Sequence, residues 1–274
     1  MKQRQHSPDR REFLRRAAIA WPALHAWALA GPVDAGSGPA LPLSNPFSIR
    51  ELRLQTTRLE EIGPFYEKVL GLPVEQRAGS VSIRIGASLL TYRQIEGDDE
   101  PYYHVAFNIP ENKIDRAIEW SAERIELIPR SGTDDPIVHF RNIDAHSVYF
   151  FDPAGNLLEF IARHELANSA EGAFEAADLL NISEIGIVVD DVEETVGSLT
   201  RELGVQKYPP SRPPSDRFSA LGDANGTLIL VRRGRIWLMT DDLPGAVFPT
   251  EVLLDGPSPG KLDLPEFPYR LRTL

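Results

Sequence analysis

Hydrophobic and polar positions along the chain repeat one pattern: an apolar strand, an amphipathic helix, then several short strands. In the first unit, residues 49–56 alternate as a strand does. Residues 59–72 (LEEIGPFYEKVLGL) place apolar side chains at three- and four-residue spacing, which predicts a helix that Gly71 can end. Two further strands are expected, at residues 81–86 and 88–95.

Two more units of this kind follow. The second, residues 102–163, begins with the strand YHVAFNI and ends with SVYFFDPAGNLLEF, which reads as a strand, a turn and a strand. The third, residues 180–235, has a strand (ISEIGIVV), a helix and strands around an Asn225-Gly226 turn. The residues after 235 are too few for a full fourth unit. We expect one strand at 249–256 and a Pro/Gly-rich loop at the end.

The N-terminus carries an export pattern. Arg10 and Arg11, then Phe13-Leu14 and a basic residue, precede a short apolar run and a small-x-small cleavage sequence, Ala28-Leu29-Ala30. The alternative is a disordered basic tail with a chance arginine pair. We predict a twin-arginine signal peptide at residues 1–30 and a linker at 31–46. The twin-arginine export machinery would then be a partner, and the mature protein would be periplasmic or extracellular.

Composition narrows the chemistry. The formal net charge of −11 argues against binding to nucleic acid or to an anionic membrane surface. The absence of cysteine removes disulfides, thiolate metal sites and a cysteine nucleophile together. Hydrophobic content of 42% provides enough apolar material for a core.

Two ionisable residues stand inside apolar strands. Glu159 lies in the strand after the turn, and His104 lies in YHVAFNI. A carboxylate in such a place loses hydration energy unless something compensates it, and a bound cation is one such compensation. The alternative for His104 is a hydrogen-bonded core residue.

This pair, together with the Phe65-Tyr66-x-x-x-Leu70-Gly71 sequence, resembles the vicinal oxygen chelate (VOC) superfamily. That superfamily includes glyoxalases, extradiol dioxygenases, and fosfomycin- and bleomycin-resistance proteins. The resemblance implies an α+β fold in which paired βαβββ modules form a curved mixed sheet cup. On this basis we expect a complete VOC domain at 48–165, a partial third module at 178–256 and a Pro-rich tail at 257–274.

In this family the ligands come from the first and last strands of two paired units. The corresponding positions here are Glu51, Thr91, His104 and Glu159. The resemblance therefore implies a divalent metal (Fe, Mn, Ni, Co or Zn) held by Glu51, His104 and Glu159. Thr91 departs from the glyoxalase pattern, which has an acid there. Glu51 departs from the usual histidine, and a surface ion pair with a neighbouring arginine is its alternative.

The third unit is expected to be metal-free and structural. Its Glu184 matches the position of Glu51, but Leu230 falls where Glu159 would be. The candidate catalytic residues are Glu159, Tyr149 and His139. Tyr149 could hydrogen-bond a substrate oxygen, and His139, like His146, could move protons because imidazole titrates near neutral pH. The alternatives are an aromatic core residue for Tyr149 and structural roles for both histidines.

The sequence thus favours an exported metal-dependent enzyme of the glyoxalase or dioxygenase kind. Its metal would chelate vicinal oxygens of a small-molecule substrate. The alternative is a non-catalytic VOC protein that binds and sequesters a small molecule; a structural accessory subunit is a weaker third reading. Because family members often dimerise, the resemblance also implies a homodimer.

Overall fold

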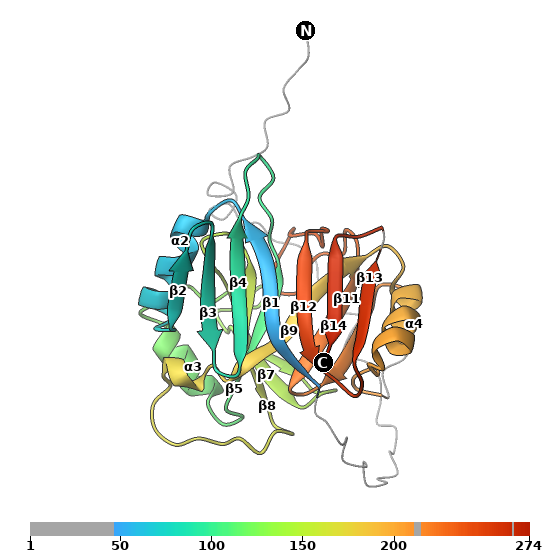
Figure 1. Cartoon of the computed structure of the whole chain (residues 1–274). Coiled ribbons are helices and arrows are strands. Elements are labelled where there is room, and N and C mark those ends of the chain that lie inside the picture. The colour runs from blue at the N-terminus through green and yellow to red at the C-terminus, as the bar shows by residue number, and fades with distance from the viewer. Residues whose placement is uncertain (1–46, 211–214, 265) are drawn as a thin grey trace, which may run out of the picture. The chain divides into compact units, whose positions relative to one another are not determined.

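One mixed sheet of 14 strands organises the residues that the computed structural model describes, which are 47–210, 215–264 and 266–274. The predicted signal peptide and linker lie outside these residues. The long path through the sheet runs β13-β14-β12-β1-β9-β5-β8-β7-β6, and the other strands branch from it (Figure 1). The strands are β1 (Ser48–Thr56), β2 (Val74–Arg77), β3 (Ser80–Ile85), β4 (Ser88–Gln94), β5 (His104–Ile109), β6 (Val138–Phe140), β7 (Ala145–Phe151), β8 (Leu157–Arg163), β9 (Asn181–Val189), β10 (Phe218–Asp223), β11 (Gly226–Arg232), β12 (Thr250–Asp255), β13 (Gly260–Leu264) and β14 (Tyr269–Thr273).

Few helices accompany the sheet, so the α+β prediction is confirmed. They are α2 (Leu59–Pro64), which continues into a π-helical turn (Phe65–Val69), α3 (Ile114–Ser121), a short 3₁₀ turn (Ala176–Asp178) and α4 (Val192–Leu203). The side chain of Asp191 accepts a hydrogen bond from Glu194 N at 2.9 Å and caps α4, and Gly204, with φ of 69°, ends it. Leu199 and Leu203 are fully buried, so the apolar face of α4 packs on the core.

Each repeated unit places its first strand parallel to its last strand. The pairs are β1·β4, β5·β8, β9·β11 and β12·β14. The sequence predicts one strand and a loop in this region, but residues 257–274 form two strands, β13 and β14. Strand β14 forms because YRLRT alternates: Tyr269, Leu271 and Thr273 are buried and the two arginines are exposed.

The units pair differently from the expected arrangement. The second unit pairs with the third through antiparallel β5·β9, and the first pairs with the C-terminal strands through antiparallel β1·β12. The halves meet where β1 runs beside β9, in register at Ile49 and Ile182. The second and third units, rather than the first and second, therefore share a face at the centre of the sheet.

No helix in the described part of the chain is both long enough and apolar enough to span a bilayer.

We predict that Leu52→Ala weakens the whole fold. Leu52 is fully buried on β1, the strand that contacts β4, β9 and β12, so the substitution leaves a cavity in the core. The free energy of unfolding should fall by about 2–5 kcal/mol in chemical denaturation. The exposed Glu67→Ala is the matched control, expected within about 0.5 kcal/mol of the parent. Equal losses in both variants would contradict this account.

Candidate metal centre

Three ionisable side chains meet on one face of the central strands. His104 is on β5, Glu159 on β8 and Glu184 on β9, and β5 lies between the other two. His104 Nε2 is 3.5 Å from Glu159 Oε2 and 3.7 Å from Glu184 Oε2. One ligand atom from each residue lies within 4.8 Å of the others, and all three residues are buried. We call this group the central site.

Strand register explains why these residues converge. Ala106 on β5 is paired with Glu159 on one side and with Glu184 on the other. Directly paired residues point to the same face, so the two carboxylates flank Ala106. His104 lies two residues earlier on the same strand and shares that face because strand side chains alternate. The side chain of Ala106, between the two carboxylates, is a single methyl group that carries no charge.

Hydrogen bonds orient the histidine and one carboxylate. His104 Nδ1 is 3.2 Å from Leu157 O. A proton on Nδ1 donated to that carbonyl leaves the Nε2 lone pair directed at the carboxylates. Glu184 Oε1 accepts a hydrogen bond from Arg163 Nη2 at 2.5 Å, and Arg163 Nε donates to Ser183 Oγ at 3.2 Å. The other oxygen of Glu184 therefore faces His104.

The electrostatics of the central site follow from burial and charge. Burial, followed by repulsion from Glu184, raises the pKa of Glu159 to about 7. Burial also opposes ionisation of Glu184, but the facing imidazole of His104 and the charge of Arg163 outweigh this and lower the pKa of Glu184. Burial would lower the pKa of His104, but the two carboxylates raise it overall. The metal-free central site thus holds protons up to neutral pH.

The donor set fits a divalent first-row metal ion. One imidazole nitrogen and carboxylate oxygens suit such ions, and three protein ligands leave coordination positions open. Glu159 Oε1 is buried and has no hydrogen-bond partner. An unpartnered buried carboxylate oxygen is costly, and a cation between the carboxylates would satisfy it. His104, Glu159 and Glu184 are thus the residues that would hold the ion.

Aromatic side chains cover the central site. The ring of Tyr149 lies 6.2 Å from that of His104, and the ring of Trp237 lies 5.1 Å away. Burial and the nearby Glu159 keep the pKa of Tyr149 well above its usual value, so its hydroxyl keeps its proton. Gly186 gives the indole room, because a Cβ there would lie 2.5 Å from Trp237 Cη2. Trp237 therefore packs against both His104 and the β9 backbone.

The structure does not bring Glu51 to the central site. Both oxygens of Glu51 are paired with Arg53, at 2.9 and 3.0 Å, and Arg53 also reaches Glu251 on β12 at 3.5 Å. Thr91 hydrogen-bonds Ser82 at 3.0 Å. We call the group of Glu51, Arg53 and Glu251 the flanking face. Arg53 is paired there with Glu251, just as Ala106 is paired with Glu184 at the central site, so the strand register is the same but a guanidinium takes the place of a methyl group. The ion-pair alternative for Glu51 matches this geometry.

The other candidates fall in different places. Tyr149 lies beside Glu159, as expected from their direct pairing. His139 does not reach the central site; it lies opposite His146, three residues before Tyr149 and therefore on the other face of the sheet. The position equivalent to Glu159 in the third unit is Ile229, which is paired with Gly186, rather than Leu230.

The sequence does not predict two residues here, Glu184 in the central site and Arg163 beside it. Glu184 carries the same signal as Glu159, an acid within an apolar strand, but it belongs to a unit that was expected to be structural. The burial of Arg163 is not predictable from its neighbours in the sequence, because an arginine at the end of a strand is usually exposed, yet Arg163 ends β8 and is completely buried.

Comparisons with known proteins show the fold. No protein-family model matches the chain, and no curated protein matches it. Among solved structures, a Bacillus subtilis protein suggested to be a dioxygenase aligns over 82% of this chain and 84% of its own, at 13% identity and a TM-score of 0.53. A V278E variant of glyoxalase I from Zea mays aligns over 84% and 92%, at 12% identity and a TM-score of 0.51. The chain thus has the fold of the VOC proteins, as the resemblance implied.

We predict that Gly186→Ala destabilises the protein through Trp237. The added methyl would overlap the indole and crowd His104 Cβ at 3.3 Å, which should cost about 1–3 kcal/mol. A double-mutant cycle with Trp237→Ala, measured by denaturation, tests the cause. The cost of the alanine should largely vanish in the Trp237→Ala background. An unchanged cost there would show that the indole is not what excludes a side chain.

Proposed function

We propose that the protein is an exported metal-dependent enzyme of the glyoxalase or dioxygenase kind. His104, Glu159 and Glu184 would bind a divalent ion that chelates two neighbouring oxygens of a small substrate. The observation that carries this proposal is a buried imidazole between two buried carboxylates, one with an unpartnered oxygen. The twin-arginine pattern supports export, to the periplasm or beyond the cell. A homodimer stays a prediction.

The bound ion would act as a Lewis acid on the substrate oxygens. The protein groups prepare the central site for that role. Arg163 keeps Glu184 ionised, and the Leu157 carbonyl fixes the His104 tautomer. Tyr149 keeps its proton and can donate it in a hydrogen bond to Glu159 or to a substrate oxygen. Glu159 is the group able to exchange a proton near neutral pH.

The cover over the central site constrains access. Trp237 is almost fully buried, but its neighbours Ile236 and Leu238 are 41% and 45% exposed. The covering segment is therefore thin, with solvent on its outer side. A substrate would reach the ion by displacing this indole, and the displaced ring would leave an apolar space beside His104.

The apolar lining of the central site favours a second function, that of a non-catalytic small-molecule-binding protein. A cluster of apolar and aromatic side chains surrounds His104 on the same face, and such a lining suits an aromatic or hydrophobic ligand without any metal. Its buried members are Tyr149, Leu157, Val188, Ala220, Ile229, Val231 and Trp237.

Elemental analysis of the protein matured in its native compartment separates the two functions. We expect stoichiometric divalent metal in the parent and its loss in His104→Ala and Glu184→Gln, because each removes a ligand from the central site. Glu51→Gln is the matched control and should retain the metal, since Arg53 already neutralises Glu51. No metal in the parent would favour the binding protein. Loss in Glu51→Gln but not in Glu184→Gln would overturn this ligand set.

Metal affinity should depend on pH in one direction. The metal-free Glu159 holds its proton up to about pH 7, so a metal ion must displace that proton at lower pH. We expect the affinity to fall by at least tenfold per pH unit below 7, because the pKa of the second ligand, His104, is raised as well and its proton must also be displaced. A competition titration against a chelator between pH 5.5 and 8 measures this. A flat profile across that range would contradict the burial-raised pKa.

A further inference from the structure

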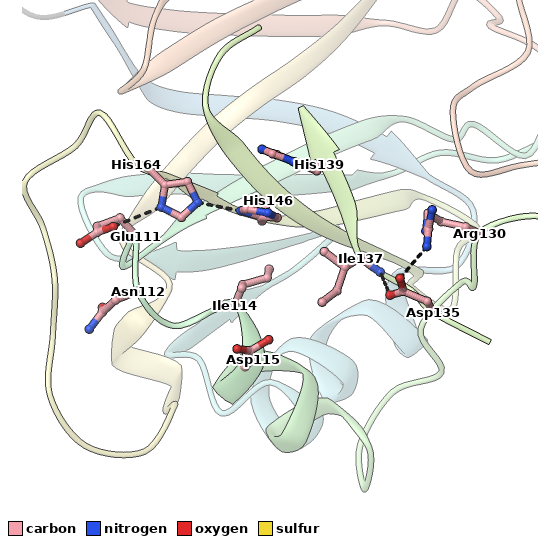
Figure 2. A pocket seen from close by; sticks show the side chains of 10 residues that line it. All are labelled: Glu111, Asn112, Ile114, Asp115, Arg130, Asp135, Ile137, His139, His146 and His164. Atoms are coloured by element: carbon pink, nitrogen blue, oxygen red, sulfur yellow. Dashed lines mark hydrogen bonds and ion pairs between the residues drawn. The ribbon is translucent and has the colours of Figure 1, made fainter. Parts of the chain in front are cut away.

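Three histidines gather on the face of the sheet opposite the central site. They are His139 on β6, His146 on β7 and His164 directly after β8, and they line one surface cavity of about 510 Å³ (Figure 2). In the described part of the chain, His104 is the only other histidine. The proposed function uses none of the three.

Their contacts form a chain of imidazoles. His139 and His146 are directly paired across antiparallel β6 and β7, with ring centroids 4.2 Å apart and planes within 13°. His146 Nδ1 lies 2.7 Å from His164 Nε2. This contact needs one shared proton, because two bare lone pairs, or two N–H groups, would repel each other. The short contact therefore brings two ligand-type nitrogens to one point.

A carboxylate fixes the tautomer of the third histidine. Glu111 Oε2 accepts a hydrogen bond from His164 Nδ1 at 3.1 Å, and Ser169 donates to the other oxygen of Glu111. A proton held on Nδ1 leaves a lone pair on Nε2 of His164, the nitrogen that Figure 2 shows in contact with His146. A histidine that donates its second nitrogen to a carboxylate is the usual arrangement of a metal-ligating histidine.

The surroundings favour a cation. Asp115 and Glu111 line the same cavity. The negative charges of Asp115 and Asp144 favour a positive charge at His146. Arg130 lines it too, but it is paired with Asp135 at 2.6 Å. His139 is exposed, so packing does not explain its presence. Imidazole donors without thiolates select borderline ions such as Zn²⁺, Ni²⁺ or Cu²⁺ over Mg²⁺ and Ca²⁺.

We propose that His139, His146 and His164 form a second metal site, for a borderline divalent ion, that is independent of the central site. Zn–N distances of about 2.0–2.1 Å place tetrahedral ligand nitrogens roughly 3.3 Å apart. The His146–His164 contact then opens by roughly half an ångström as the ion replaces the shared proton. In the structure the ring of His139 is stacked on His146 rather than within ligand reach, so it would have to turn off His146 to complete the set.

The ion would join two parts of the chain. His139 and His146 belong to the β6–β7 edge, whereas His164 begins the segment that leads to β9. That segment is already tied to the start of the second unit's helix, because Glu111 N donates to Asn168 and Ala170 N donates to Asn112. A bound ion would add a connection between this segment and the sheet edge, and so stabilise the folded state by mass action.

Equilibrium dialysis of the untagged full chain against Zn²⁺, with elemental analysis, tests the second site. We expect two ions per chain in the parent, one in His146→Ala and one in His104→Ala, and none in the double variant. His25→Ala is the matched control for stray imidazole binding and should retain two. An ion count in His146→Ala equal to the parent's would overturn the second site. Loss in His146→Ala but not in His104→Ala would instead count against the proposed function and leave this site standing.

Two further variants guard against misfolding. His139→Ala removes an exposed side chain and should lose the same ion while keeping the metal-free melting temperature of the parent. Glu111→Gln should keep the site but weaken its Zn²⁺ affinity by about 10- to 100-fold, because the tautomer of His164 is less firmly held. An unchanged Zn²⁺ affinity in both variants would contradict the proposal.

Discussion

The burial of two carboxylates beside one small residue is the constraint on which the centre of this protein depends. Glu159 and Glu184 both pair with Ala106, so strand register alone forces their charges together away from water. Such charges are costly to bury unless they are paired. Arg163 neutralises one of them, His104 faces both, and one oxygen of Glu159 is left over. That unpartnered oxygen is the feature that a bound cation would satisfy.

The flanking face shows how one side chain changes the outcome. Its register is the same, with Glu51 in the place of His104 and Glu251 in the place of Glu184. Where the central site has Ala106, the flanking face has Arg53, whose guanidinium lies between the two carboxylates. An internal cation there removes both the space and the charge that would attract a metal ion. The repeat therefore builds the same strand register twice, and only at the central site does no arginine lie between the acidic residues.

Much of the local structure could be predicted from periodicity, and the arrangement of the units could not. The strands that hold His104 and Glu159 stand out because they are apolar runs with one ionisable residue each. Which units pair is a long-range property, because the local pattern of β5 is compatible with pairing to the first or to the third unit. The sequence therefore predicts a structural role for the third unit and for Glu184 within it. Arg163 was missed because its burial comes from β9 and Tyr208 rather than from its own strand. Strands β13 and β14 are not predicted from the sequence, because the Pro and Gly residues of the C-terminal segment favour a loop and the alternating pattern of apolar and polar residues there is short.

The cover formed by Trp237 links packing to reactivity. Its indole fits only because residue 186 is glycine, and it excludes water from a group of charges whose interactions strengthen in a dry environment. Under the proposed function the same exclusion would block a substrate, so a substrate would reach the central site only when the segment around residue 237 moves. Ile236 and Leu238 are exposed on either side of the indole, so little packing on the outer face resists that movement. Stability at Gly186 and access to His104 are therefore controlled by the same aromatic ring.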